Sequence, residues 1–255
     1  MAANQQVVRF SSIRQACSDC SLIQLCLPFS LGAKAVERLD DIVQRRRPLK
    51  RGEHLYRAGD DFKAIYAVRA GAIKTTLVSI QGEEQILGFH LPGEILGLDA
   101  INSNQHSCDA IALEVTSVCE IPFENLEQLA VQIPELQQAL LRIMSKEIFN
   151  DQKLLQMVAK GSAEERLASA LVGFSERFGR RGLSRKSFSL PMSRIELSNH
   201  LGLAPETMSR LFKRFQEAGL LQASGKDVTI KDKDALCELA GLCRVNPLGK
   251  MADQS

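Results

Sequence analysis

Hydrophobic and polar positions change their spacing several times along the chain. Apolar residues recur at helical intervals from Val36 to Val43. From about residue 46 to 126 the pattern becomes short runs separated by glycine-containing turns such as Gln81-Gly82. Four of these runs predict strands of about five to seven residues, at 64–69, 72–78, 84–90 and 117–122. Many short strands at regular spacing indicate a small barrel or a double-sheet roll.

One long helix is predicted from Pro134 to Lys160, because no glycine and no further proline lies within this stretch. Gly161 ends it. Ser162 and Glu165 then have the S-x-x-E form of a capping box, which predicts the start of the next helix. Three helical patterns and a candidate hairpin follow up to about residue 243, and a loose tail is expected beyond it.

The segment from Arg194 to Lys213 has the pattern of a helix-turn-helix. Gly202 falls at the turn, where the backbone needs a positive φ. Pro205 falls at the start of the second helix, where its missing N–H has no effect. The positions where two short helices would pack together are all apolar, and they are Leu197, Leu201, Leu203, Met208 and Leu211. Beyond a turn at 224–226, residues 228–230 predict the second strand of a wing.

The second helix of this motif predicts a DNA-reading surface. Arginine can bond to guanine, glutamate can accept a hydrogen bond from cytosine, and serine can bond to either kind of base edge. Three of the polar residues are expected to hold phosphates instead, namely Thr207, Lys213 and Arg214. The whole exposed set is Glu206, Thr207, Ser209, Arg210, Lys213 and Arg214. The competing interpretation is an ordinary helical hairpin with a charged face.

The composition and charge of the chain indicate where the protein is located and what kind of partner it binds. The chain has 45% hydrophobic and 24% charged residues, which is typical of a soluble globular protein. No apolar run approaches the length of a membrane span and no secretory segment precedes residue 12, so we expect a cytoplasmic protein with no membrane partner. The net charge is only +2, but basic residues are concentrated between 162 and 226, which suggests an anionic partner such as nucleic acid.

The seven cysteines suggest metal binding, because a cytosolic protein does not rely on a disulfide framework. Cys17, Cys20 and Cys26 form a C-x2-C-x5-C motif. Three thiolates this close can share one metal centre if a fourth ligand comes from elsewhere. The spacing leaves an iron–sulfur cluster, structural zinc and other roles open. It does not choose the fourth ligand among Cys108, Cys119, Cys237 and Cys243.

Five stretches carry a more specific signal. They read CSDCSLIQLCLPF at 17–29, GFHLPG at 88–93, VCEIPF at 118–123, AEERLA at 163–168 and LGLAPETMSR at 201–210. In this order they resemble the Fnr branch (fumarate and nitrate reduction regulators) of the Crp–Fnr superfamily, over about residues 10–243. The resemblance implies an α+β fold with an N-terminal β-roll sensor domain of the cyclic-nucleotide-binding jelly-roll type. A long dimerisation helix and a C-terminal winged helix-turn-helix would follow.

The resemblance also implies a division of the chain and a way of working. The expected segments are a cysteine-rich cluster-binding loop at 1–30, the β-roll at 31–133, the dimerisation helix at 134–160, the DNA-binding domain at 161–243 and a flexible tail at 244–255. One [4Fe–4S] cluster, which oxygen would degrade to a [2Fe–2S] form and then remove, would be bound by Cys17, Cys20, Cys26 and Cys119. The intact cluster would favour a DNA-binding homodimer.

Such a dimer would act as an oxygen-responsive global transcription regulator that controls anaerobic gene expression. It would bind a palindromic DNA site with TTGAT-like half-sites, read by Glu206, Ser209 and Arg210. An activator must also touch RNA polymerase, and the turn similar to the family's contact surface contains Ser79, Gly82, Glu83 and Glu84. One residue departs from the family. Ala204 stands where a helix-capping hydroxyl is usual, and losing that cap costs the second helix about 1 kcal/mol.

The long helix carries a candidate dimer seam with coiled-coil spacing. Its members are Leu141, Met144, Ile148, Asp151, Leu155 and Val158. Asp151 is the exception, since in a two-fold dimer it would face its own copy. Two such charges some 4 Å apart repel by about 4 kcal/mol at an effective dielectric of 20. We hypothesise that cluster binding repacks the helix and offsets this repulsion. The alternative is that Asp151 is solvated at the helix surface.

Other classes of protein have less support. A cyclic-nucleotide receptor needs a glutamate and an arginine where this chain has Leu98 and Cys108, and Asp109 would repel the phosphate, so we expect no cyclic nucleotide. The four histidines are scattered without a catalytic partner at motif spacing, so an enzyme is not expected. They are His54, His90, His106 and His200. The serious alternative is a zinc- or ligand-controlled Crp-type regulator without redox sensing.

Overall fold

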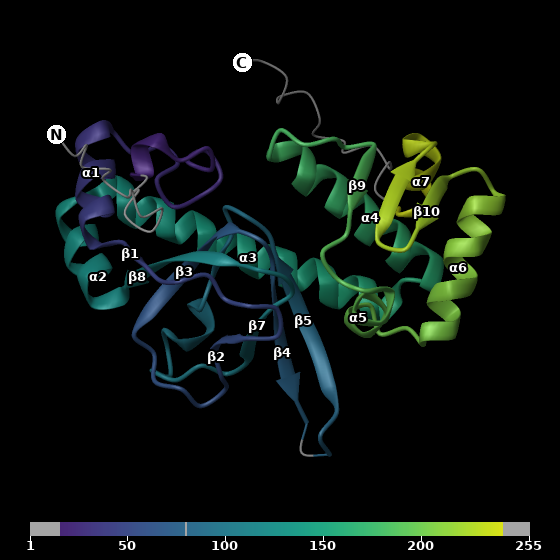
Figure 1. The fold of residues 1–255 in the computed structure, drawn as a ribbon, viewed down its shortest axis with the longest axis horizontal. Coiled ribbons are helices and arrows are strands. Elements are labelled where there is room, and N and C mark those ends of the chain that lie inside the picture. Colours follow the sequence, from purple (N-terminus) through teal and green to yellow (C-terminus); the bar gives the residue numbers. More distant parts are fainter. Residues whose placement is uncertain (1–15, 80, 242–255) are drawn as a thin grey trace, which may run out of the picture.

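A β-roll of two antiparallel sheets forms the N-terminal half of the computed structural model, which describes residues 16–79 and 81–241 (Figure 1). One sheet has the strand order β1-β8-β3-β6, which are Gln44–Arg45, Ser117–Pro122, Ala64–Ala70 and Ile95–Leu96. The other has the order β2-β7-β4-β5, which are His54–Tyr56, Asp109–Ala112, Ile73–Val78 and Glu84–His90. The predicted strands correspond to β3, β4, β5 and β8, and the double-sheet roll is confirmed.

Strand β3 shows why this half of the chain folds as it does. Successive side chains of a strand point to opposite faces, and here both faces are covered. Ile65 and Ala67 belong to a hydrophobic cluster under the N-terminal helices, whereas Tyr66 and Val68 belong to the cluster between the sheets. A strand buried on both faces has a nearly continuous apolar sequence, and the first five residues of β3 are all buried.

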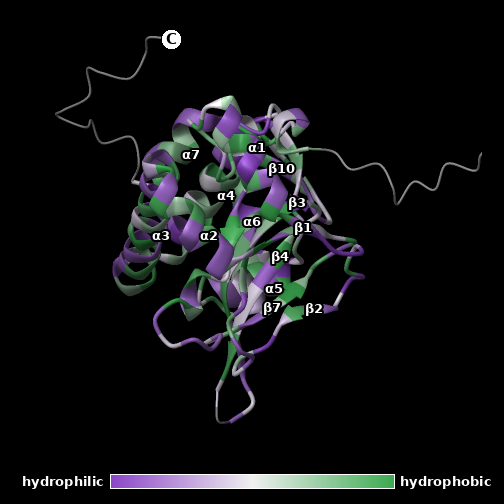
Figure 2. Ribbon diagram, turned by 90° about the vertical axis from the view of Figure 1, so that its left-hand side faces the viewer, coloured by the Kyte–Doolittle hydropathy of each residue, from purple (hydrophilic) through white to green (hydrophobic). Residues whose placement is uncertain are grey.

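Three helices cover the sheet that contains β3. They are α1 (Ala33–Ile42), α2 (Phe123–Gln132) and α3 (Pro134–Lys160), and they share one hydrophobic cluster with that sheet. Short 3-10 turns lie at Cys17–Asp19 (η2) and Leu98–Ala100 (η3). Helix α3 has the bounds that the sequence predicted, with proline in its first turn. Its buried residues, Leu136 and Ala139, lie near its N-terminal end, and polar and apolar positions alternate along the rest (Figure 2).

The C-terminal unit is a winged helix-turn-helix. It contains α4 (Ala163–Arg180), α5 (Arg194–His200), α6 (Pro205–Glu217) and α7 (Lys233–Leu239), together with the sheet β10-β11-β9 (Leu221–Ser224, Asp227–Ile230 and Ser187–Ser189). The predicted capping box is confirmed, since Ser162 and Glu165 each bond to the other's backbone. Sequence patterns predicted three helices and a hairpin here. The structure adds α7 and the third strand, β9.

The winged unit lies beside strands β4 and β5 of the roll (Figure 1). The side chain of Asn199 on α5 accepts from the backbone N–H of Ile86 at 2.7 Å and donates to the backbone oxygen of Glu84 at 2.7 Å. The helix that begins the DNA-binding motif is therefore fixed to the edge strand of the roll. Among the described helices, none combines the length and the apolar character that a bilayer span requires.

Candidate functional site

The predicted cysteine ligands come from two distant parts of the chain. Cys17 opens η2, Cys20 caps it, and Cys26 precedes Leu27, which is completely buried. Cys119 lies in the middle of β8. Cys17, Cys26 and Cys119 all pack against the hydrophobic cluster that includes Leu27. The buried leucine therefore anchors the N-terminal loop beside the strand that carries Cys119.

Burial and neighbouring charges change the pKa of three of these thiols. Burial is the largest cause at Cys17 and Cys26, and the pKa of each reaches about 12. Asp40 and then thiolates at Cys119 and Cys26 add to the rise at Cys17, and thiolates at Cys119 and Cys20 add to the rise at Cys26. Burial also raises the pKa of Cys119, although Arg45 and Arg69 oppose it. Without a metal these buried groups are thiols at neutral pH, so a metal must displace their protons.

The donor chemistry of these residues fits a thiolate-bound metal centre. Thiolates are soft ligands that suit iron–sulfur clusters and zinc, and a set of four satisfies either. Within residues 16–79 and 81–241, no three His, Cys, Asp or Glu side chains are already grouped around the position of a single metal ion. The structure thus brings the predicted cysteines together at one face of the roll without giving them metal-ligand spacing.

The remaining cysteines lie elsewhere. Cys108 is buried between the sheets, and its Sγ lies 3.8 Å from Oδ2 of Asp99. Cys237 packs against the core of the winged unit. Cys243 lies outside the described residues. Burial as a small apolar residue accounts for Cys108 and Cys237. That Leu98 and Cys108 leave no cyclic-nucleotide site remains a prediction.

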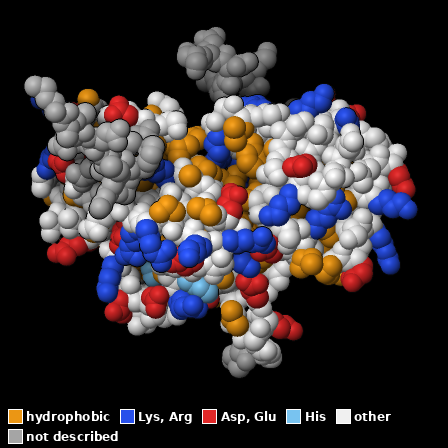
Figure 3. Space-filling view, viewed as in Figure 1, with side chains coloured by type: hydrophobic (Ala, Val, Ile, Leu, Met, Phe, Trp, Pro, Cys, Tyr) orange, Lys and Arg blue, Asp and Glu red, His pale blue; other side chains and the backbone are white. Residues whose placement is uncertain are grey.

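The helix-turn-helix presents the polar surface that the sequence predicted. Gly202 has φ of +62° at the turn, and Met208 on α6 is fully buried against the core. Ala204 offers no side-chain cap to α6, as expected. Of the candidate DNA-binding residues, Thr207 is half-buried and the others are exposed, which are Glu206, Ser209, Arg210, Lys213 and Arg214. Lysine and arginine side chains stand along the outer edge formed by α6 (Figure 3).

Some residues of this surface already have partners within the chain. Arg214 forms an ion pair with Glu164, at the start of α4. Nζ of Lys213 lies 3.7 Å from Oε1 of Glu217, one turn further along α6. The basic side chain of each pair is exposed, at 68% for Arg214 and 78% for Lys213, so each pair contributes little and can exchange for a phosphate contact. The surface is thus free to meet a negatively charged partner.

The candidate seam of α3 is largely uncovered in a single chain. Leu141, Ile148 and Leu155 are exposed at 60%, 56% and 71%. Met144 and Val158 are half-buried. Large aliphatic side chains in a row on one helix are rarely left in water, and such a row is characteristic of an interaction surface. The dimerisation role of these residues remains a prediction.

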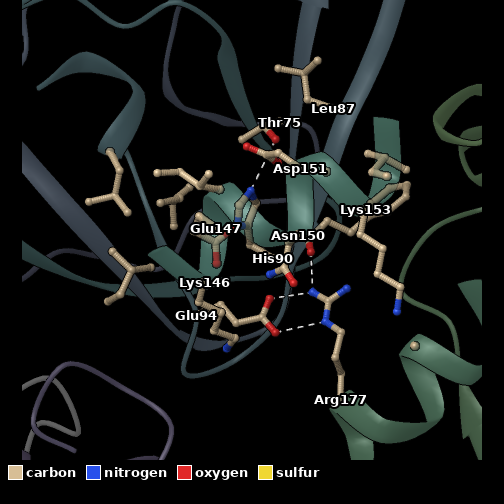
Figure 4. Close-up of a pocket in the computed structure, with 18 of the residues that line it drawn as sticks. Thr75, Leu87, His90, Glu94, Lys146, Glu147, Asn150, Asp151, Lys153 and Arg177 are labelled. Carbon is tan, nitrogen blue, oxygen red and sulfur yellow. Dashed lines mark hydrogen bonds and ion pairs between the residues drawn. The ribbon is translucent and has the colours of Figure 1, made fainter. Parts of the chain in front are cut away.

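Asp151 stands beside a cavity of about 730 Å³ between α3, the roll and α4. Figure 4 shows it near Thr75 and His90, with Glu147 pointing into the same space. Partial burial raises the pKa of Asp151, and burial is also the first cause of the raised pKa of Glu147. Whether Asp151 faces its own copy in a dimer is not tested by one chain.

The candidate polymerase contact forms the turn between β4 and β5. Gly82 has a φ of +83°, and the Ser79 backbone N–H donates to the oxygen of Glu83 at 2.9 Å. Glu83 is exposed, whereas Glu84 is 2.9 Å from Nζ of Lys74. Glu84 is therefore engaged within the chain, and Glu83 is the freer of the two carboxylates.

A partly buried charge cluster that the sequence did not predict joins the two halves. Glu94, which follows Gly93 in the roll, lies 2.5 Å from Nη2 of Arg177 (Figure 4). It also lies 2.7 Å from Nη2 of Arg181. The two arginines also donate to the backbone oxygens of Phe89 and Pro92. They hold the pKa of Glu94 down at about 2, against burial, which raises it. No sequence pattern marks this cluster, because only the fold brings these residues together.

Comparison with known proteins decides the family. Residues 46–132 match the cyclic nucleotide-binding domain and residues 165–239 match the Crp-like helix-turn-helix domain. The transcriptional activator protein FnrA of Stutzerimonas stutzeri is 53% identical over 235 residues, which are 92% of this chain and 96% of the relative. This chain belongs to the Crp–Fnr family of transcription regulators. It is accordingly a regulator rather than an enzyme.

Other relatives agree with this placement. The fumarate and nitrate reduction regulatory protein of Escherichia coli strain K12 is 47% identical over 228 residues, covering 89% of this chain and 91% of the relative. The structure of FixK2 from Bradyrhizobium japonicum covers 78% of this chain and 97% of its own, with a TM-score of 0.69 and 26% identity. The Crp–Fnr fold expected from the sequence is therefore confirmed.

Proposed function

We propose that this protein is an oxygen-responsive global transcription regulator that senses oxygen through a [4Fe–4S] cluster. The proposed ligands are Cys17, Cys20, Cys26 and Cys119. The observation that carries the proposal is the approach of Cys119, on β8, to the N-terminal cysteine loop, where Cys17, Cys26 and Cys119 pack against one hydrophobic cluster. When bound, the cluster supplies an oxygen-reactive iron and sulfide centre. The two relatives named as FnrA and as a fumarate and nitrate reduction regulatory protein support this function.

The chain's own residues shield the site and connect it to the rest of the protein. Leu27 is fully buried in the hydrophobic cluster against which Cys17, Cys26 and Cys119 pack, so these half-buried thiols are partly shielded from water. Leu136 and Ala139, near the start of α3, belong to the same cluster. A change in how the cysteine loop packs therefore reaches the base of α3. We propose that this is the route from cluster to dimer.

The proposed homodimer forms along α3. Leu141, Ile148 and Leu155 are exposed in one chain, and a second copy would bury them. The full seam also includes Met144, Asp151 and Val158. We retain the hypothesis that repulsion between two copies of Asp151 keeps the cluster-free dimer marginal, and that cluster binding offsets it.

The proposed DNA site is palindromic, with TTGAT-like half-sites, because a two-fold dimer presents two copies of α6. Glu206, Ser209 and Arg210 would read base edges. Thr207, Lys213 and Arg214 would hold phosphates. Regulated genes would be those of anaerobic metabolism. The protein would act in the cytoplasm, and its turn with Ser79, Gly82, Glu83 and Glu84 would contact RNA polymerase.

The proposal divides the chain by role. The segments are the cluster-binding loop at 1–30, the sensor roll at 31–133, the dimerisation helix at 134–160, the DNA-binding domain at 161–243 and the tail at 244–255. The first and last segments lie partly outside the described residues. Limited proteolysis of protein with and without cluster would test these boundaries.

Anaerobic purification with iron and sulfide analysis tests the function. We expect brown protein with broad visible absorbance and about four irons and four sulfides per chain. The variants Cys20→Ser and Cys119→Ser should lose the cluster and the affinity for the palindrome. Cys237→Ser, at a half-buried position on α7, is the matched control and should keep both. A colourless zinc protein, or unchanged metal content in Cys20→Ser and Cys119→Ser, would contradict the proposal.

A further inference from the structure

Two charged residues connect the first cysteine to the strand that carries the last. The backbone N–H of Cys17 donates to Oδ1 of Asp40, near the end of α1, at 3.0 Å. The same oxygen accepts from Nη2 of Arg45 at 2.6 Å. Arg45 lies on β1, directly opposite Cys119 on β8. An unbroken series of contacts thus runs from Cys17 through Asp40 and Arg45 to the backbone of β8.

This pair is sheltered from water. The side chains of Asp40 and Arg45 are exposed at only 20% and 17%, and their neighbours Leu39 and Val43 are buried in the same cluster as the cysteines. Electrostatic effects are stronger in such surroundings than at the open surface. A charge at either position therefore acts on the thiols with little screening.

The two charges are opposite in sign and lie where the loop meets β8. Asp40 places a carboxylate against the backbone N–H of Cys17. Arg45 places a guanidinium against that carboxylate, on the residue of β1 that pairs with Cys119. A cluster held by four thiolates carries a net negative charge, so Arg45 favours it and Asp40, taken alone, opposes it. The guanidinium also neutralises Asp40, which leaves the carboxylate free to hold the loop.

We propose that Asp40 and Arg45 are positioning residues for the cluster: Asp40 fixes the Cys17 end of the loop to α1, and Arg45 places a positive charge beside Cys17 and Cys119. This inference rests on the proposed function, since it concerns the same four ligands. Partners that orient metal ligands from behind commonly change metal affinity by about ten-fold to a hundred-fold when they are removed.

The test separates charge from geometry with four substitutions. Arg45→Met keeps most of the side-chain bulk without the charge, and we expect its visible absorbance to decay in air about ten times faster than that of the wild type. Arg45→Lys restores a charge and should recover part of the difference. Asp40→Ala removes the contact to Cys17 and should bind less iron on anaerobic reconstitution. Asp40→Asn keeps an acceptor but removes the negative charge, so its iron content should equal or exceed that of the wild type.

Arg47→Met is the matched control, because Arg47 lies two residues further along, is exposed and pairs with Glu53 instead. It should behave as the wild type does. Circular dichroism and thermal unfolding of the metal-free proteins show whether each variant folds. If Arg45→Met does not fold, the two Asp40 variants still test the positioning role. Asp40→Ala should bind less iron than the wild type, and Asp40→Asn should bind as much or more.

The outcomes distinguish this inference from the proposed function. If wild-type protein binds iron and sulfide but all Asp40 and Arg45 variants match Arg47→Met in iron content and decay rate, the positioning role is wrong and the function stands. Equal losses in Asp40→Asn and Asp40→Ala would also overturn it, because charge and contact would then not act separately. If wild-type protein binds no iron and sulfide, the proposed function itself fails.

Discussion

Replacement of Glu94 by glutamine should weaken the junction between the roll and the winged unit. The carboxylate of Glu94 faces Arg177 and Arg181 at 2.5 and 2.7 Å and accepts from the Leu91 backbone N–H at 3.0 Å. A carboxyl whose pKa falls from 4.5 to about 2 on folding contributes about 3 kcal/mol to stability near neutral pH. Breaking a buried ion pair by removing one partner costs about 3–5 kcal/mol, and the value from the pKa of Glu94 agrees with the lower end of this range.

The assay is urea unfolding of the metal-free protein, followed by circular dichroism. At pH 7 we expect Glu94→Gln to lower the free energy of unfolding by about 3 kcal/mol, or to split one transition into two because the halves are no longer coupled. The matched control is Glu176→Gln, since Glu176 pairs with Lys233 and Arg185 at the surface of α4. Each of these surface ion pairs contributes about 0–1 kcal/mol to stability, so Glu176→Gln should change the free energy of unfolding little.

The pH dependence gives a second check. A carboxyl with a lowered pKa contributes its full stability above the pKa it has when unfolded, and loses it as the pH falls toward the folded value. The difference between wild type and Glu94→Gln should therefore shrink between about pH 4.5 and pH 2. A difference from Glu176→Gln of less than about 0.5 kcal/mol at pH 7 would refute the reasoning.

Three further predictions follow from the candidate sites. Arg210→Ala should cost about 1–3 kcal/mol at one base pair of the site, whereas Lys213→Ala should weaken all sequences alike and reduce the salt dependence of binding; equal losses on every sequence for both would contradict the assignment. Asp151→Ala should sediment as a dimer in air, and a monomer without cluster would contradict the repulsion hypothesis. In metal-free protein, alkylation of Cys17 and Cys26 should be slow at pH 8 and accelerate toward pH 12, because the thiolate is the reactive form; fast alkylation at pH 8 would show that these thiols are not buried.

Short-range sequence signals, such as a proline at a helix start or a glycine at a turn, predicted the elements whose ends they determine. Helix α3 has the predicted bounds because proline starts it and Gly161 ends it, and the turn glycine Gly202 has the expected positive φ. Strands of two to four residues, such as β6 and β7, were not predicted, because a run this short is too brief to show an alternating pattern. The same is true of β9, which exists only through its pairing with β11.

The site was less predictable than the fold. The N-terminal cysteines are visible as a motif, but spacing did not choose Cys119 over Cys108. The structure distinguishes the two cysteines. Cys119 packs against the hydrophobic cluster beneath the N-terminal loop, whereas Cys108 belongs to the hydrophobic cluster between the sheets. Asp40, Arg45 and Glu94 are ordinary charged residues in the sequence. Their roles depend on partners that only the folded chain brings near.

Helix α3 has the geometry of a lever, because it is long and is buried only at one end. Its 27 residues make a rod of about 40 Å, and its buried residues lie within the first two turns. These turns are buried in the same hydrophobic cluster against which Cys17, Cys26 and Cys119 pack. A tilt of about 5° at that base would displace the far end of such a rod by about 3.5 Å. A rearrangement around the thiols that tilted these turns would therefore be magnified at the end where the DNA-binding unit begins.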